Sequence, residues 1–141
     1  MAGILLISHD DFATGLLKSV KMIAGDYKNI MAIPFYEDDD LLDFKSVLQN
    51  KIEELAKVDD EVLIFVDLYG ATPFNFVGQI FEELKNKNIN IRVISGMNLP
   101  MILESVFLLE TGELSVDELY EDIIKIGKNG ITELCEELKL K

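Results

Sequence analysis

Short apolar runs alternate with longer segments of helical periodicity along the chain. Residues 3–8 (GILLIS) form the first apolar run, which is typical of a strand buried on both faces of a parallel sheet. The next apolar side chains recur at helical spacing, and Gly25 is a C-terminal stop signal. The pattern predicts a strand and then a helix whose apolar residues at helical spacing are Phe12, Leu16, Leu17, Val20 and Ile23.

The same alternation continues along the chain. Further strands are predicted over residues 30–35, 61–67 and 90–95. The helix after the second strand has an apolar stripe made of Leu41, Phe44, Leu48, Ile52 and Leu55. Later helices are predicted over residues 74–84, with Pro73 near the first turn, from Met101 onward, and over residues 116–126.

Strands that alternate with helices predict the α/β class. We expect a doubly wound, mainly parallel sheet of four strands with flanking helices. The chain has no internal repeat, low-complexity stretch or linker rich in Pro, Gly and Ser. Residues 1–141 are therefore predicted to form a single domain, whose last residues carry no clear pattern.

Net charge, the length of the apolar runs and the cysteine count limit which partners and which cellular compartment are expected. A formal charge of −13 opposes binding to nucleic acid or to anionic membrane surfaces. No apolar run reaches the roughly 18 to 20 residues that a membrane span requires. The single cysteine, Cys135, cannot form an internal disulfide, which suits a reducing compartment, and we expect it to be a half-buried helix residue. These features predict a cytoplasmic protein.

Polar clusters follow three of the predicted strands. They are residues 8–11 (SHDD), 67–75 (DLYGATPFN) and 95–100 (SGMNLP). Loops that leave the carboxyl ends of parallel strands share one edge of the sheet, and ligands bind in the crevice there. We therefore expect the chemistry of the protein at this edge.

His9 is the only histidine, so any histidine chemistry must use it. It follows a buried strand directly, although a lone surface imidazole would also fit this position. Asp67 ends the third strand, and its carboxylate could accept the Nδ1 proton of His9, which leaves Nε2 free as a nucleophile. The alternative for Asp67 is a cap or turn residue.

The turn after Asp67 offers a place for a phosphoryl group. Gly70, Ala71 and Thr72 lead into a helix N-terminus, where unpaired backbone N–H groups and the helix dipole favour an anion. The Thr72 hydroxyl could donate a further hydrogen bond. The Walker pattern is absent, which argues against bound ATP or GTP.

The remaining acidic residues and two methionines have structural interpretations that need no further chemistry. The acidic run of residues 37–40 is best read as a solvated loop, so no metal site and no cofactor are predicted. Met97 and Met101 flank the presumed site and could line it, dock a partner or fill the core.

Three segments together resemble the IIA proteins of the mannose/fructose/sorbose family of the phosphoenolpyruvate-dependent sugar phosphotransferase system. Residues 3–30 (GILLISHDDFATGLLKSVKMIAGDYKNI) are similar to the family's opening, where the phosphorylated histidine follows the first strand. Residues 62–81 (VLIFVDLYGATPFNFVGQIF) resemble its most recognisable segment, in which Asp67 falls on the carboxylate that pairs with the active histidine. Residues 93–105 (VISGMNLPMILES) resemble the third active-site segment.

The resemblance implies a phosphocarrier. Phosphorylated HPr would transfer its phosphoryl group to Nε2 of His9, with Asp67 orienting the imidazole and the segment from Gly70 to Thr72 holding the phosphoryl oxygens. The group would pass to a IIB protein or domain, and from there to a sugar that enters through membrane IIC and IID subunits. The family also forms homodimers through an exchanged C-terminal strand.

Two features depart from the family pattern. Asp10 stands where the family often has Gly and places a negative charge beside the phosphorylation site. Its side chain could cap the helix, or its charge could weaken phosphate affinity or alter the choice of partner. The loop after the third strand has Tyr69, Ala71 and Thr72 where relatives often have other aromatic residues, Gly and Ser.

Three alternatives remain open at this stage. One is the related phosphotransferase subunit that feeds dihydroxyacetone kinase. Another is a receiver-like signalling domain phosphorylated on Asp67, which requires Mg²⁺ and normally a lysine after a later strand. The third is a non-catalytic module on the same fold.

Overall fold

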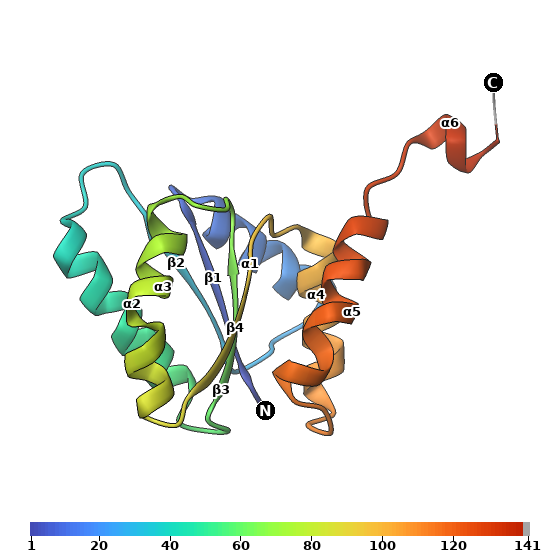
Figure 1. Cartoon of the computed structure of the whole chain (residues 1–141). Helices are drawn as coiled ribbons and strands as arrows, with labels where there is room; N and C mark the ends of the chain where they lie inside the picture. Colours follow the sequence, from blue (N-terminus) through green and yellow to red (C-terminus); the bar gives the residue numbers. More distant parts are fainter. Residues whose placement is uncertain (140–141) are drawn as a thin grey trace.

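The four predicted strands form one parallel sheet in a computed structural model that describes residues 1–139 (Figure 1). The strand order is β2-β1-β3-β4, and every neighbouring pair is parallel. The predicted α/β class and doubly wound arrangement are confirmed. The strands comprise β1 (Gly3–His9), β2 (Ile30–Phe35), β3 (Glu61–Val66) and β4 (Asn90–Ile94).

Helices connect the strands and continue after the last one. Helix α3 begins earlier than predicted because Pro73 fits the first helical turn. Helix α4 also begins earlier, since the Asn98 side chain accepts a hydrogen bond from the Met101 N–H and caps it. The helices comprise α1 (Phe12–Ala24), α2 (Leu41–Leu55), α3 (Thr72–Asn86), α4 (Leu99–Glu110), α5 (Val116–Asn129) and α6 (Leu134–Glu137).

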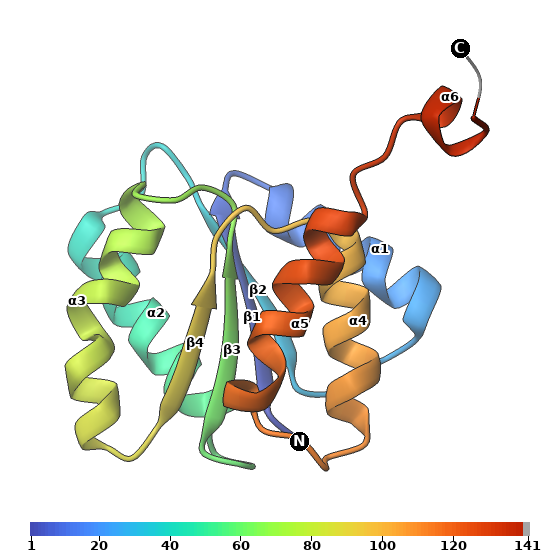
Figure 2. The ribbon, with the colours of Figure 1, turned by 45° about the vertical axis from the view of Figure 1, so that its right-hand side comes forward.

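The sheet separates two apolar cores, one on each face. In β1, Leu5 and Ile7 face the core that contains α2 and α3, while Ile4 and Leu6 face the core that contains α1, α4 and α5. Figure 2 shows these two groups of helices on opposite sides of the strands. Because both faces are covered, the central strands consist of continuous apolar runs.

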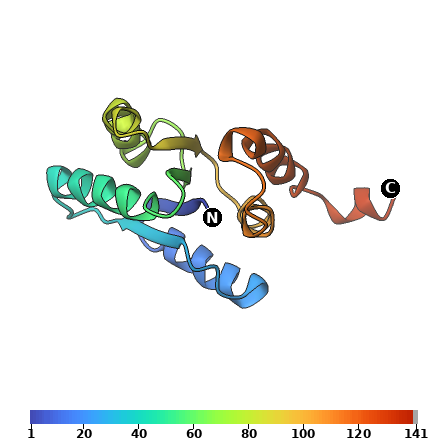
Figure 3. The same cartoon turned by 90° about the horizontal axis from the view of Figure 1, so that it is seen from below.

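Not every apolar residue at helical spacing is buried, and the predicted half-burial of Cys135 is wrong. Phe12 and Ile23 are 51% and 57% exposed, because they occupy the first and last turns of α1. Leu41, the first residue of α2, is 53% exposed. Cys135 does lie in a helix but is exposed, since α6 projects away from the body of the molecule (Figure 3). Met97 and Met101 are buried, as the core-filling interpretation expects.

The order of the strands determines where a site can form. The connection from β1 leads to one side of the sheet, through α1 to β2, and the next leads back across to β3. The carboxyl ends of β1 and β3 are therefore neighbours at the point where the winding reverses. In open α/β sheets, ligands bind in this crevice.

The C-terminal end of the chain bears on three predictions. In the described range, residues 1–139, no helix is long and apolar enough to cross a membrane. No residue between 95 and 139 belongs to a strand of the sheet, so the exchanged C-terminal strand stays a prediction. The predicted domain, residues 1–141, includes two residues outside the described range, and its extent also stays a prediction.

Candidate functional site

His9 and Asp67 meet at the carboxyl edge of the sheet. His9 is the last residue of β1, and Asp67 directly follows β3. Strands β1 and β3 are hydrogen-bonded neighbours, with Ile7 opposite Val66. Residues that are 58 positions apart in the chain are thus brought into contact.

One carboxylate oxygen of Asp67 contacts His9 twice. Asp67 Oδ2 lies 2.8 Å from His9 Nδ1 and accepts the His9 backbone N–H, also at 2.8 Å. A carboxylate accepts hydrogen bonds, so this geometry places the proton of a neutral imidazole on Nδ1. Nε2 then carries the free lone pair, and the His9 side chain is 48% exposed to solvent.

Asp67 itself is held firmly at the end of β3. Its backbone N–H donates to the Ile7 carbonyl at 3.2 Å, and its side chain is only 14% exposed. Its second oxygen, Oδ1, is buried and has no hydrogen-bond partner among residues 1–139. The carboxylate is therefore committed to His9 and is not a freely solvated turn residue.

The loop between β1 and α1 positions His9 through backbone hydrogen bonds. Asp10 adopts a left-handed conformation with φ 50°, and its N–H donates to the Phe35 carbonyl at 2.8 Å. The Asp10 side chain accepts the Asp11 N–H at 2.8 Å. Asp10 thus turns the chain sharply and binds its own loop, and it is Asp11 that stands at the N-cap position of α1.

Neighbouring rings flank this loop. Phe35, opposite His9 in the register with β2, packs edge-on with a centroid separation of 6.3 Å. The Tyr36 hydroxyl donates to Asp11 Oδ1 at 2.6 Å, and this hydrogen bond raises the pKa of Tyr36. Sequence reasoning did not single out Phe35; its position as the last residue of the second predicted strand was the available signal.

The predicted phosphate-binding segment lies between β3 and α3. Gly70 has φ 76°, a left-handed conformation that favours glycine. Ala71 is the N-cap residue of α3, and its methyl side chain cannot cap the helix. The N–H groups of Thr72 and Phe74 in the first turn therefore have no intrahelical acceptor, which suits an anion.

The third polar cluster, residues 95–100, stabilises the end of β3 next to Asp67. Met97 N–H donates to the Val66 carbonyl at 3.1 Å, next to Asp67, and the Met97 side chain is buried. Asn98 caps α4 and also donates from Nδ2 to the Gly127 carbonyl at 2.9 Å. This segment fixes the end of β3 instead of presenting reactive side chains.

The acidic loop of residues 37–40 has a structural explanation. Asp39 accepts the Tyr36 N–H at 2.8 Å, and Asp40 caps α2 by accepting the Asp43 N–H at 3.0 Å. Throughout the part of the chain that the structure describes, no group of three or more His, Cys, Asp or Glu side chains is arranged to hold a metal ion.

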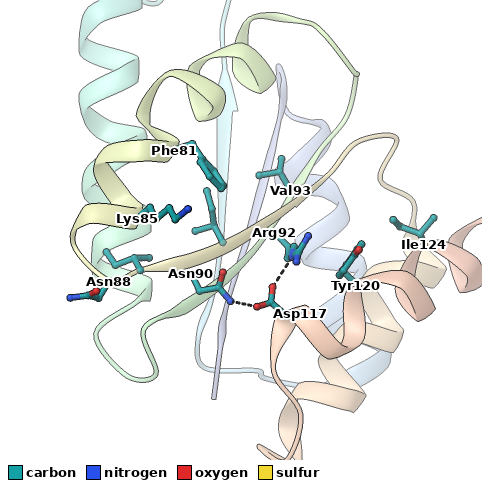
Figure 4. Close-up of a pocket in the computed structure, with 11 residues that line it drawn as sticks. Phe81, Lys85, Asn88, Asn90, Arg92, Val93, Asp117, Tyr120 and Ile124 are labelled. Carbon is teal, nitrogen blue, oxygen red and sulfur yellow. Dashed lines mark hydrogen bonds and ion pairs between the residues drawn. The ribbon is translucent and has the colours of Figure 1, made fainter.

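A large groove lies away from His9, along the outer edge of β4. Its volume is about 650 Å³, and it runs between α3 and α5 (Figure 4). Arg92 lies over the Tyr120 ring and donates from Nε to Asp117 at 2.7 Å, so its charge is already paired. The other lining side chains are both apolar, such as Phe81 and Ile124, and polar, such as Lys85 and Asn90. A groove with this mixed lining beside the outer edge of a strand suits a polypeptide segment.

Comparisons with known proteins show which sequences this chain is similar to. The family model described as PTS system fructose IIA component matches residues 3–124. The PTS system fructose-specific EIIA component of Bacillus subtilis is 26% identical over 137 residues, covering 97% of this chain and 88% of the relative. The sorbose-specific EIIA component of Klebsiella pneumoniae is 32% identical over 127 residues, covering 90% and 87%.

Solved structures of similar sequence share the fold of this chain. The phosphotransferase system component EIIA from Streptococcus agalactiae superposes with a TM-score of 0.81 at 31% identity, covering 94% of this chain and 97% of that one. The mannose/sorbose specific IIA subunit from Enterococcus faecalis has a TM-score of 0.79 at 26% identity and covers 94% of both chains.

Proposed function

This chain belongs to the family of the PTS system fructose IIA component, and we propose that it carries the phosphoryl group on Nε2 of His9. It is a phosphocarrier of a sugar phosphotransferase system and acts as a phosphotransferase in that relay. Membership in the family displaces the receiver-like and dihydroxyacetone kinase alternatives. The observation that carries the proposal for His9 is its 2.8 Å contact from Nδ1 to Asp67 Oδ2.

The proposed chemistry follows from that contact. Asp67 keeps the proton of the neutral imidazole on Nδ1, so Nε2 can attack phosphorus in line with the bond to the donor. The new P–N bond forms as the bond between phosphorus and the donor breaks. The imidazole gains positive charge during this step, and the Asp67 carboxylate stabilises it.

The loop before α3 is proposed to hold the phosphoryl oxygens. The unpaired N–H groups in the first turn of α3 and the positive end of its dipole favour a dianion. Thr72, with its hydroxyl, and Gly70, with its left-handed turn, complete this segment, and Ala71 adds no side chain that would obstruct it.

The proposed partners are phosphorylated HPr as donor and a IIB protein or domain as acceptor. Both must approach the His9 side chain, which is 48% exposed. Leu68 and Tyr69, which directly follow Asp67 in the chain, are 59% and 76% exposed. The net charge of −13 would speed encounter with basic partner surfaces. The membrane IIC and IID subunits act further along the relay, and the proposed location of this chain is the cytoplasm.

A homodimer is proposed on two features of the described residues. Strand β4 pairs only with β3 among residues 1–139, so its outer edge opens into the groove of Figure 4. The C-terminal segment presents apolar side chains that the described chain leaves exposed, namely Ile131, Leu134 and Leu138. Exchange of this segment onto the partner's β4 edge would cover both surfaces.

Deletion of residues 131–141 should then convert the dimer into a monomer in sedimentation velocity. A dimer that survives the deletion contradicts the exchange.

Intact-mass analysis tests the proposed phosphorylation. The protein is incubated with phosphoenolpyruvate, enzyme I and HPr, and wild type is compared with His9→Ala. We expect one acid-labile, alkali-stable phosphoryl adduct in wild type and none in the variant. An adduct that persists in His9→Ala, or none in wild type under conditions that phosphorylate another IIA protein, would refute the proposal.

A further inference from the structure

The structure buries two serine side chains completely, and one of them lies directly before His9. Ser8 and Ser105 both have an exposed fraction of 0%. Buried polar groups carry hydrogen bonds, so each hydroxyl must have a local task. Ser105 Oγ donates to the Met101 carbonyl at 2.7 Å within α4, a bond that is local to one helix. The hydrogen bonds of Ser8, in contrast, connect β1 with the following loop and with α1.

The Ser8 hydroxyl bridges the two ends of the loop that carries His9. Its oxygen accepts the Ala13 N–H at 2.6 Å, and it donates to the Asp10 carbonyl at 3.2 Å. Ala13 belongs to the first turn of α1, whose N-cap residue, Asp11, makes no side-chain capping hydrogen bond with any described residue. The hydroxyl of Ser8 thus replaces the missing cap.

This bridge completes a set of hydrogen bonds around the reacting imidazole. The His9 N–H is taken by Asp67, the Asp10 N–H by the Phe35 carbonyl, and the Ala13 N–H by Ser8. The loop therefore has fixed partners in β2, in the residue after β3 and in its own preceding strand. A loop constrained on all sides holds a side chain to the sub-ångström precision that group transfer requires.

We propose that Ser8 is a positioning residue for phosphoryl transfer: its buried hydroxyl fixes the β1–α1 loop so that His9 Nδ1 stays on Asp67 and Nε2 stays aimed at the donor. The proposal rests on the function proposed above for His9. Without the hydroxyl, the Ala13 N–H and the Asp10 carbonyl lose a buried partner, and the loop must rearrange to find others. The substitution should slow the transfer step more than it weakens donor binding.

The test compares Ser8→Ala with Ser105→Ala, since each removes one fully buried hydroxyl. Single-turnover phosphorylation by an excess of phospho-HPr gives the maximal transfer rate, called kcat here, and the half-saturating donor concentration, called KM here. ¹⁵N NMR of the imidazole reports which nitrogen carries the proton. For Ser8→Ala we expect kcat to fall by about 10-fold or more, with KM changed less than about threefold. We also expect a larger population of the tautomer protonated at Nε2. Ser105→Ala should retain the kcat and the tautomer of wild type.

The outcomes distinguish the positioning role of Ser8 from the proposed phosphorylation of His9. If Ser8→Ala does not fold, Ser8→Cys takes its place under the same criteria, since a thiol is only a weak donor and acceptor. Equal kcat and equal tautomer populations in the Ser8 and Ser105 variants would overturn the role of Ser8 while wild type still accepts phosphate on His9. A wild type that is never phosphorylated on His9 would instead refute the proposed function itself.

Discussion

Replacement of Asp67 by Asn tests the central contact of the site with almost no change of shape. In the wild type, the Asp67 carboxylate accepts both the His9 backbone N–H and the Nδ1–H through Oδ2. An Asn side chain presents only one atom at the place of Oδ2, which faces both N–H groups of His9. If that atom is the amide oxygen, both hydrogen bonds are kept, but the negative charge that stabilises the imidazolium is lost. If it is the amide nitrogen, it donates to Nδ1 and favours the tautomer with the proton on Nε2, which has no lone pair with which to attack phosphorus, and it also opposes the His9 backbone N–H.

The expected loss combines two effects. A hydrogen bond to a charged group is worth about 1.5–3 kcal/mol, which is roughly 10- to 150-fold in rate if it is made fully only in the transition state. Molecules in which the amide nitrogen faces His9 add to this loss, because their Nε2 is protonated. We expect phosphoryl transfer from phospho-HPr to Asp67→Asn to slow by about 10²- to 10⁴-fold, measured by rapid quench. The melting temperature should show that the variant is folded.

Asp10→Asn is the matched control, because it also removes one negative charge beside His9. Asn tolerates the left-handed conformation at φ 50° and keeps an oxygen to accept the Asp11 N–H. Its transfer rate should stay within about fivefold of wild type, since only an exposed charge is lost. A rate for Asp67→Asn within about threefold of that of Asp10→Asn would show that neither the charge of the Asp67 carboxylate nor its control of the tautomer contributes to the transfer step.

The remaining predictions concern stability. A Cβ at Gly3 would lie 2.7 Å from Leu55 Cβ and 3.1 Å from the Leu55 carbonyl oxygen, neither of which is the end of a flexible side chain, so Gly3→Ala should destabilise the protein by about 1–3 kcal/mol in urea unfolding. Gly78→Ala, where a Cβ meets no described atom within 4 Å, should instead stabilise by about 0.5–1 kcal/mol; similar losses in both would contradict the packing argument. Burial and the carboxylate of Glu110 raise the pKa of Tyr27 to about 12. The native state then keeps a proton that the unfolded state loses near pH 10, so stability is complete below about pH 10 and falls as pH rises toward about 12. Urea midpoints between about pH 9 and 11.5 should drop by an amount equivalent to at most about 2–3 kcal/mol, and Tyr27→Phe should show a flatter profile.

Apolar runs predicted the strands well because both faces of the sheet are covered. Residues 4–7 and 62–66 are fully buried, so their continuous apolar pattern has one simple explanation. Helix ends were predicted less well. Phe12 and Ile23 follow the periodicity of α1, but periodicity does not reveal where the opposing surface stops.

The site was predictable in its parts and less so in its assembly. His9 and Asp67 each follow an apolar strand, which places both at one edge of any parallel sheet. Their direct contact depends on β1 and β3 being neighbours, and strand order is a property of the whole packing. Ser8 could not be recognised as a bridge, since its partners depend on the path of the loop back to Ala13.

The backbone of the loop explains why Asp is acceptable at position 10. The family resemblance often places Gly after the histidine, and here that residue has φ 50°. Left-handed conformations are open to Gly and, among other residues, most readily to Asn and Asp. The Asp10 carboxylate also accepts the N–H of Asp11, so part of its charge is satisfied within the loop. The requirement at this position is thus a left-handed turn that aims His9 at Asp67. Asp meets this requirement at the cost of a negative charge beside the proposed phosphoryl site, and Asp10→Asn would remove that charge.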